Sequence, residues 1–101
     1  MMGNPPRFLF RIDASANSGT GHLRRCLTIA EELRSHGAKI FFTCRAESFS
    51  VEKFLENVAT GWEEYDWNLT PEEDAQKVVD SSRRFRVDSV IVDHYRANEA
   101  Y

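Results

Sequence analysis

The sequence has little of what marks several common classes of protein. It has only two cysteines, Cys26 and Cys44, which do not form a Cys-x-x-Cys pair, so neither a disulfide framework nor a zinc site is indicated. No apolar run approaches the length needed to cross a membrane, and residues 1–6 lack the apolar stretch of a signal peptide. We therefore expect a cytoplasmic protein that keeps both thiols reduced and buried.

The sequence also lacks an excess of positive charge, with a formal net charge of −3. It has no basic stripe and no interleaved aromatic platform, so we expect no nucleic-acid partner. A single phosphate site needs no net positive charge and stays open. His94 could join Asp93 and His22 around a metal ion, but no spaced cluster of ligands supports that interpretation. We expect neither a metal nor a cofactor.

What is present suits one small globular domain. The chain has 101 residues, of which 42% are apolar and 29% charged, which is an ordinary globular composition. We expect residues 1–6 to form a flexible leader and residues 7–101 to form the domain. Apolar runs and helical periodicity predict strands at 8–12, 39–44 and 87–92, helices at 21–36, 51–58 and 70–84, and a strand or turn at 61–67.

Two of the expected helices carry strong sequence signals. In the first, Leu23, Cys26, Leu27, Ala30 and Leu33 fall on one apolar stripe at about 100° per residue, opposite Arg24, Thr28 and Glu31. In the last, Thr70 is a good N-cap, Pro71 suits the first helical position and acidic residues fill the first turn. We expect Ser50 to cap the helix between them.

The alternation of strands and helices predicts an α/β fold with a Rossmann-like parallel sheet and flanking helices. In such sheets, ligands bind beyond the carboxyl ends of the strands. Two polar segments follow strands here. One is Asp13–Arg25, which comprises the loop 13–21 and the first turn of the helix, and the other is Asp93–Tyr95. We expect them to meet at the switch point. Half of a doubly wound sheet would also leave an exposed edge, which suggests a truncated chain that could associate through that edge.

The segment Gly19-Thr20-Gly21-His22 places two glycines before a helix N-terminus. Glycine lets a ligand approach the backbone, and free helix N–H groups favour anions. The pattern is not a dinucleotide fingerprint, because Arg24 stands where that motif needs Gly or Ala, and it lacks the Gly-Lys-Ser/Thr ending of a P-loop. A tight strand-to-helix turn without a ligand is the alternative.

His22 is the main candidate for chemistry, because a positive helix end lowers the pKa of a histidine and favours the neutral form, which can act as a base. A histidine that only caps or packs is the alternative. Arg25 could hold a carboxylate or phosphate, or form a salt bridge to Asp13 or another acid. Asp13 could accept N–H groups of the loop or orient His22. We expect the acidic stretches 63–66 and 72–74 to be a solvated face and a helix cap.

The segments Ile12-Asp13-Ala14-Ser15, Gly19-Thr20-Gly21-His22-Leu23 and Arg25-Cys26-Leu27-x-Ile29-Ala30 resemble a known family in register. This is the UDP-sugar hydrolase of pseudaminic acid biosynthesis, which is related to spore-coat polysaccharide biosynthesis proteins. The later segment 90–95, which ends in Asp-His-Tyr, resembles the family's strand followed by Asp-x-Tyr. The resemblance is thin across residues 46–82.

The resemblance implies the N-terminal part of a GT-B-like, two-domain architecture whose active site lies in the interdomain cleft. The implied reaction is hydrolysis of UDP-2,4-diacetamido-2,4,6-trideoxy-β-L-altrose to UDP and the free sugar, without a metal. His22 would be the general base that activates water at the anomeric carbon. The residues that would bind the UDP-sugar substrate are Asp13, Gly19, Gly21, Arg25, Asp93 and Tyr95.

Family members continue into a second Rossmann-like domain that supplies most of the uridine and diphosphate contacts, so we expect this chain alone to be inactive. Two other functions stay open. A GT-B glycosyltransferase would use the same loop to bind a donor or acceptor phosphate. A non-catalytic polysaccharide-biosynthesis module would bind no UDP-sugar at His22. The exact sugar and the oligomeric state cannot be derived from the sequence.

Overall fold

The computed structural model describes residues 4–15, 21–47, 52–66 and 68–93, with the backbone alone described at residues 14, 15, 21, 22, 46, 47 and 93. Strands and helices alternate along the chain. In order they are β1 (Arg7–Ser15), α1 (Gly21–Ser35), β2 (Lys39–Glu47), α2 (Glu52–Leu55), β3 (Gly61–Tyr65), α3 (Pro71–Arg84) and β4 (Ser89–Asp93).

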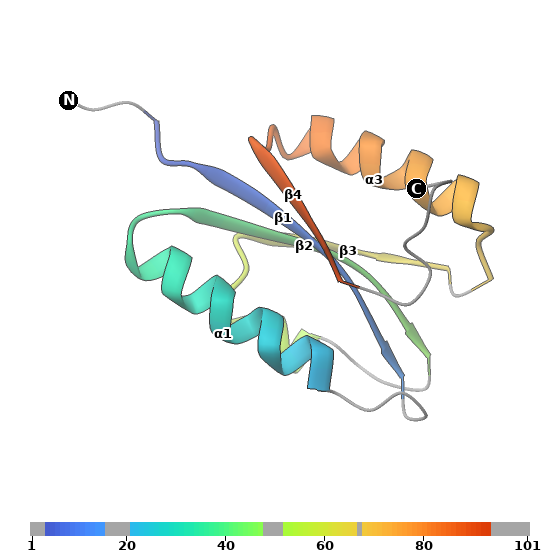
Figure 1. Ribbon diagram of the computed structural model, residues 1–101, viewed down its shortest axis with the longest axis horizontal. Helices are drawn as coiled ribbons and strands as arrows, with labels where there is room; N and C mark the ends of the chain where they lie inside the picture. The colour runs from blue at the N-terminus through green and yellow to red at the C-terminus, as the bar shows by residue number, and fades with distance from the viewer. Residues whose placement is uncertain (1–3, 16–20, 48–51, 67, 94–101) are drawn as a thin grey trace.

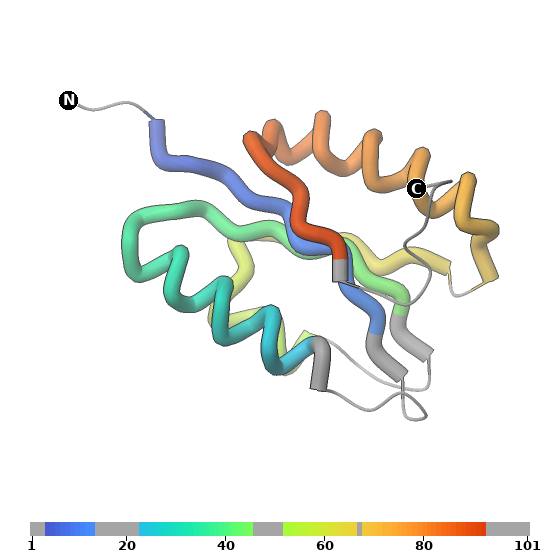
Figure 2. The backbone as a smooth tube through the Cα atoms, in the orientation of Figure 1, coloured from blue at the N-terminus to red at the C-terminus, as the bar shows by residue number. Residues whose placement is uncertain are grey.

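The four strands form one parallel sheet in the order β3-β2-β1-β4. This is the order of the first four strands of a doubly wound Rossmann sheet, in which the chain returns past β1 to place β4 on its other side. The predicted α/β, Rossmann-like class is therefore confirmed, while the two-domain GT-B architecture stays a prediction. Helices α1 and α3 cover opposite faces of the sheet (Figure 1), and the backbone trace shows the same three layers (Figure 2).

The larger core lies between the sheet and α1. The stripe predicted for this helix is confirmed, since Leu23, Cys26 and Ala30 are buried and Leu27 and Leu33 pack against them. Alternate strand residues such as Phe10 and Phe42, whose rings stack with centroids 5.3 Å apart, supply the other side.

The cysteines lie in this same core. Cys26 and Cys44 are both buried as free thiols, as predicted. Burial raises the pKa of the Cys44 thiol to about 12, so the thiol stays protonated and unreactive at neutral pH.

The start of α3 follows the predicted pattern in detail. Thr70 is the N-cap, and its hydroxyl accepts a hydrogen bond from the Glu73 N–H at 3.1 Å. The Glu73 carboxylate in turn accepts the Thr70 N–H at 2.9 Å, which completes a capping box. This backbone hydrogen bond, together with the Thr70 hydroxyl, lowers the pKa of Glu73. The cap fixes where α3 begins, and with it the position of every side chain in its first turn.

The structure corrects several predicted boundaries. β1 does not end at Ile12, and β2 does not end at Cys44, because the two strands stay paired as far as Ser15 and Glu47, past the oppositely charged register partners Asp13 and Arg45. The helix expected at 51–58 is shorter, since the Leu55 carbonyl accepts both the Val58 and Ala59 N–H groups in a closing turn. β4 begins at Ser89 rather than at residue 87. The expected cap Ser50 lies outside the described residues.

β4 lies at one edge of the sheet that the structure describes. On its α3 side, Val90 and Val92 are 40% and 39% exposed, so α3 does not cover this strand. β4 is a terminal strand of the sheet among the described residues, and association through its edge stays a prediction. Within the described segments, no helix has the length and apolar character needed to span a membrane.

Candidate functional site

The predicted adjacency of β1 and β4 is confirmed, although β4 ends opposite Ile12 and β1 continues to Ser15. Ile12 and Asp93 are register partners, so the chain leaves both strands at the same edge of the sheet. Helix α1 begins beside this edge, with Gly21 and His22 as its first two residues (Figure 1). The edge formed by the ends of β1, β2 and β4 and the start of α1 is called the carboxyl edge below.

The structure describes some of the predicted site residues in full and others by their backbone alone. Asp13 is described in full, buried near the end of β1, and Arg25 is exposed on the first turns of α1. Only the backbone of Gly21, His22 and Asp93 is described, and all three lie at the carboxyl edge. The predictions for Gly19 and Tyr95 lie outside the described residues.

A buried ion pair joins β1 to α3 beneath this edge. The Arg11 guanidinium is fully buried and binds Asp74 in a bidentate manner, with Nε to Oδ1 at 2.9 Å and Nη2 to Oδ2 at 2.5 Å. Its Nη1 donates to Asp13 Oδ1 at 2.8 Å and to the Ile12 carbonyl. The guanidinium also lies 5.3 Å from the ring centroid of Tyr65. The charge of Arg11 is therefore held in one fixed orientation.

A second bidentate pair continues the network along β2. Arg45 donates from Nε to Asp13 Oδ1 at 3.1 Å and from Nη2 to Asp13 Oδ2 at 2.6 Å. Arg45 Nε also lies 3.7 Å from Asp74 Oδ2. Two arginines and two aspartates thus form a neutral buried cluster, Arg11–Asp74–Asp13–Arg45, that ties β1, β2 and α3 together. We call it the charge tetrad.

The tetrad keeps Asp13 ionised. Burial by itself would raise the pKa of this carboxyl, but the hydrogen bond from Arg45 and the charge and hydrogen bond of Arg11 outweigh it, and the pKa falls below its ordinary value. Asp13 is therefore a fixed anion that can accept hydrogen bonds but cannot act as a general acid. Its two oxygens both hold guanidinium groups, so its main role is to anchor Arg11 and Arg45.

A second polar network lies between β3 and α3. The Tyr65 hydroxyl and Ser81 Oγ are hydrogen-bonded at 2.6 Å, Ser81 Oγ donates to Glu63, and Arg84 Nη2 binds Glu63 at 2.7 Å. The hydrogen bond from Arg84 lowers the pKa of Glu63 in spite of its partial burial, whereas burial raises the pKa of Tyr65. These groups fix α3 over the sheet and leave Tyr65 neutral.

The tetrad was not predicted from the sequence, and the prediction for the acidic stretches was wrong at Asp74. That residue was expected on a solvated face, yet its side chain is fully buried by Arg11. Arg11 was passed over within the apolar run of residues 8–12. A signal was present, because a strand buried on both faces cannot hold an arginine without a buried partner.

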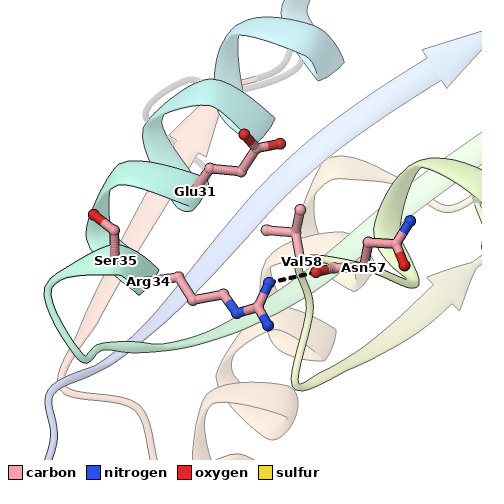
Figure 3. Close-up of a pocket in the computed structure, with 5 residues that line it drawn as sticks. All are labelled: Glu31, Arg34, Ser35, Asn57 and Val58. Atoms are coloured by element: carbon pink, nitrogen blue, oxygen red, sulfur yellow. Dashed lines mark hydrogen bonds between the residues drawn. The ribbon is translucent and has the colours of Figure 1, made fainter.

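Two hollows lined by described residues lie away from the carboxyl edge. One of about 480 Å³ lies between the end of α1 and the turn after α2, where the Arg34 guanidinium reaches the Asn57 carbonyl (Figure 3). Val58 lines it together with the polar residues Glu31, Arg34, Ser35 and Asn57. Among the described residues, no group of three or more His, Cys, Asp and Glu side chains is arranged to hold a metal ion.

Comparison with known proteins adds no relative to this description. No family model matches the chain, and neither a curated protein nor a solved structure gives a match. The site therefore has to be interpreted from its own residues.

Proposed function

We propose that this chain is the N-terminal portion of a hydrolase that cleaves a UDP-linked 2,4-diacetamido-2,4,6-trideoxyhexose. One observation carries the proposal: β1 and β4 are adjacent parallel strands, so the chain leaves both at the same edge of the sheet, and α1 begins with Gly21-His22 after the loop that follows β1. The segments that resemble the hydrolase family, 12–30 and 90–95, are the ones that lead into and out of this edge. In an open α/β sheet, this is where a ligand binds.

The chemistry we propose is attack of water on the anomeric carbon of the sugar. His22 accepts a proton from that water while a new bond forms from the water oxygen to the carbon. The bond between the anomeric carbon and the phosphate oxygen breaks, and its electron pair leaves with UDP. The products are UDP, the free sugar and a proton that His22 returns to solvent. A histidine suits this role because its pKa lies near neutral pH.

The charge tetrad supports this proposal because it holds the end of β1 in a fixed position. It fixes the last residues of β1 against β2 and the first turn of α3, so the loop that leads to His22 starts from a rigid strand end. Rigid placement matters because a general base must lie within hydrogen-bond reach of the water that it activates. Arg11 and Arg45 are consequently positioning residues rather than catalytic residues.

The test is UDP release by the full-length protein encoded by the gene, with the wild type compared with His22→Ala. His36→Ala is the matched control, because His36 lies on the same helix with an exposed side chain and only a 3.4 Å contact to Glu32. We expect His22→Ala to lose at least about 100-fold in kcat, the usual contribution of a general base, and to retain substrate binding. His36→Ala should match the wild type.

The product analysis separates this function from its rivals. Mass spectrometry of the reaction should show UDP and the free sugar, in equal amounts, with no added acceptor. If the reaction required a sugar or lipid acceptor, the function would be glycosyl transfer rather than hydrolysis. Full turnover by His22→Ala would remove His22 from the reaction, and no shift of the His22 resonances with any UDP-sugar would indicate a non-catalytic module.

A further inference from the structure

The opposite edge of the sheet, where the strands begin, carries a basic hollow of about 780 Å³. Four cationic side chains line it, Arg7 on β1, Lys39 on β2, Arg84 at the end of α3 and Arg86 just after it. Asp88 is the one acidic residue in this lining. Because the chain as a whole has a net charge of −3, this concentration of positive charge is local. The edge of the sheet at which β1, β2 and β4 begin is called the amino edge below (Figure 1).

Among the described residues, no carboxylate forms an ion pair with three of these four cations. Arg84 is paired with Glu63, and Asp88 Oδ2 accepts the backbone N–H of Arg7 at 2.9 Å. The Arg7 guanidinium donates to the Phe85 carbonyl at 2.9 Å and lies over the Phe41 ring, contacts that orient its charge without cancelling it. Lys39 and Arg86 are exposed and form no ion pair with any residue that the structure describes.

The backbone around the hollow is already ordered. The Lys39 N–H donates to the Pro6 carbonyl and the Asp88 N–H donates to the Arg7 carbonyl, both at 2.8 Å. These two bonds hold the starts of β1, β2 and β4 in register, so the charged side chains project from a fixed frame. A preorganised cluster of cations loses less entropy when it binds an anion than a mobile one does.

Arg86 is held in an unfavourable backbone conformation. Its φ is 54°, in the left-handed region, where glycine is the usual residue. The bonds from the Val87 N–H to the Ser82 carbonyl and from the Arg86 N–H to the Arg83 carbonyl form a Schellman motif, with Arg86 at the glycine position. Strained residues of this kind are concentrated at ligand clamps and functional sites. An arginine at this position makes the fold less stable than a glycine would, but it places a positive charge at the rim of the hollow.

We propose that the amino edge is a second ligand site, which binds a phosphorylated small molecule through Arg7, Lys39 and Arg86. Guanidinium and ammonium groups are the side chains that bind phosphate oxygens. The volume of the hollow, about 780 Å³, lies within the roughly 300–1,000 Å³ of small-molecule sites, so a nucleotide-sized ligand has room there. The site is independent of the proposed hydrolase, because it lies at the other end of the strands from His22.

The experiment is a titration of the full-length protein with inorganic diphosphate and with ADP, followed by calorimetry and by amide chemical shifts at low ionic strength. We expect both probes to shift the amides of Arg7, Lys39 and Arg86, with affinity that falls as salt is added. Tighter binding of ADP than of diphosphate identifies a nucleotide, and equal binding identifies the diphosphate group alone. Failure of both probes to shift these amides at about 10 mM, far above working affinities, overturns the proposal.

Two variants assign the site to its residues. Lys39→Gln and Arg86→Gly should each weaken diphosphate binding about tenfold, the effect of losing one charge-assisted contact. The matched control is Arg83→Gln, which removes an exposed arginine of α3 that does not line the hollow, and it should change the affinity less than twofold. Arg86→Gly relieves the backbone strain, so a folded and stabilised variant that has lost binding excludes unfolding as the cause. Equal affinity in all four proteins overturns the assignment.

Discussion

Helix α3 runs between two edges of the sheet whose charged side chains differ in burial and in pairing. At its start, Thr70 makes an unstrained capping box and Asp74 is fully buried in a neutral tetrad. At its end, Arg86 is strained, exposed and without a carboxylate partner among the described residues. Buried charges must be paired because their desolvation is costly, whereas exposed charges can remain open for a ligand. The comparison separates residues that hold the fold together from residues that are left for binding.

The largest effect should come from breaking the tetrad at Asp74. Asp74→Asn leaves the buried Arg11 without its bidentate carboxylate, and we expect a loss of about 3–5 kcal/mol in the free energy of unfolding. Equilibrium unfolding in urea measures it. Glu72→Gln is the control, since Glu72 is exposed in the same turn of α3, and it should change stability by less than about 0.5 kcal/mol. A loss below about 1 kcal/mol for Asp74→Asn would mean that the tetrad is not a structural unit.

A double variant sharpens that result. Arg11→Met with Asp74→Leu removes both members of the pair and replaces them with apolar side chains of similar size. Because the loss in the single variant comes from an uncompensated buried charge, the double variant should recover most of the stability. If the losses of the two single variants simply added in the double variant, the same urea measurement would show instead that Arg11 and Asp74 do not stabilise each other.

The next effect is a change in the pH dependence of stability through Asp13. The folded pKa of this carboxyl is lowered below its ordinary value of 3.8, so its contribution is fully present above that value and is lost as the pH falls below it. Asp13→Asn should lower the free energy of unfolding by about 1.5–3 kcal/mol at neutral pH. It should also weaken the fall of this free energy with decreasing pH on the acid side. Urea unfolding between pH 7 and pH 2 measures both. An equal fall in the variant would contradict the ionised Asp13.

A smaller effect should follow from removing the cap that positions Asp74. Thr70→Ala deletes the hydroxyl that accepts the Glu73 N–H, and we expect a loss of about 1 kcal/mol. The thermal unfolding midpoint checks this, with Thr70→Ser as the variant that keeps the cap. Equal midpoints for the alanine and serine variants would show that the cap does not stabilise α3.

The smallest effect has the opposite sign and lies at the other end of α3. Arg86→Gly should raise the free energy of unfolding by about 0.5–1 kcal/mol, because glycine adopts the left-handed conformation without steric cost. Urea unfolding at low phosphate measures the gain. A destabilised variant would mean that Arg86 contributes to the fold, and the contrast between the two ends of α3 would not hold.

The sequence predicted the framework of the fold better than its internal charges. Periodicity found the apolar stripe of α1, and cap chemistry found the start of α3, because both signals are local. The adjacency of β1 and β4 followed from the general topology of parallel sheets. The Arg11–Asp74 pair spans 63 residues of sequence, so no local pattern reveals it. The left-handed conformation of Arg86 was equally hidden, since glycine is the residue that would have signalled it.

The most direct test of the proposed chemistry is hydrolysis of the UDP-sugar by the full-length protein in water enriched in ¹⁸O. Attack of water on the anomeric carbon breaks the bond between carbon and oxygen, so the label enters the sugar and none enters UDP. Mass spectrometry of the released UDP reads the outcome without interference from later exchange at the free sugar. Unlabelled UDP is the result that the account predicts. Labelled UDP would show attack at phosphorus and would contradict it.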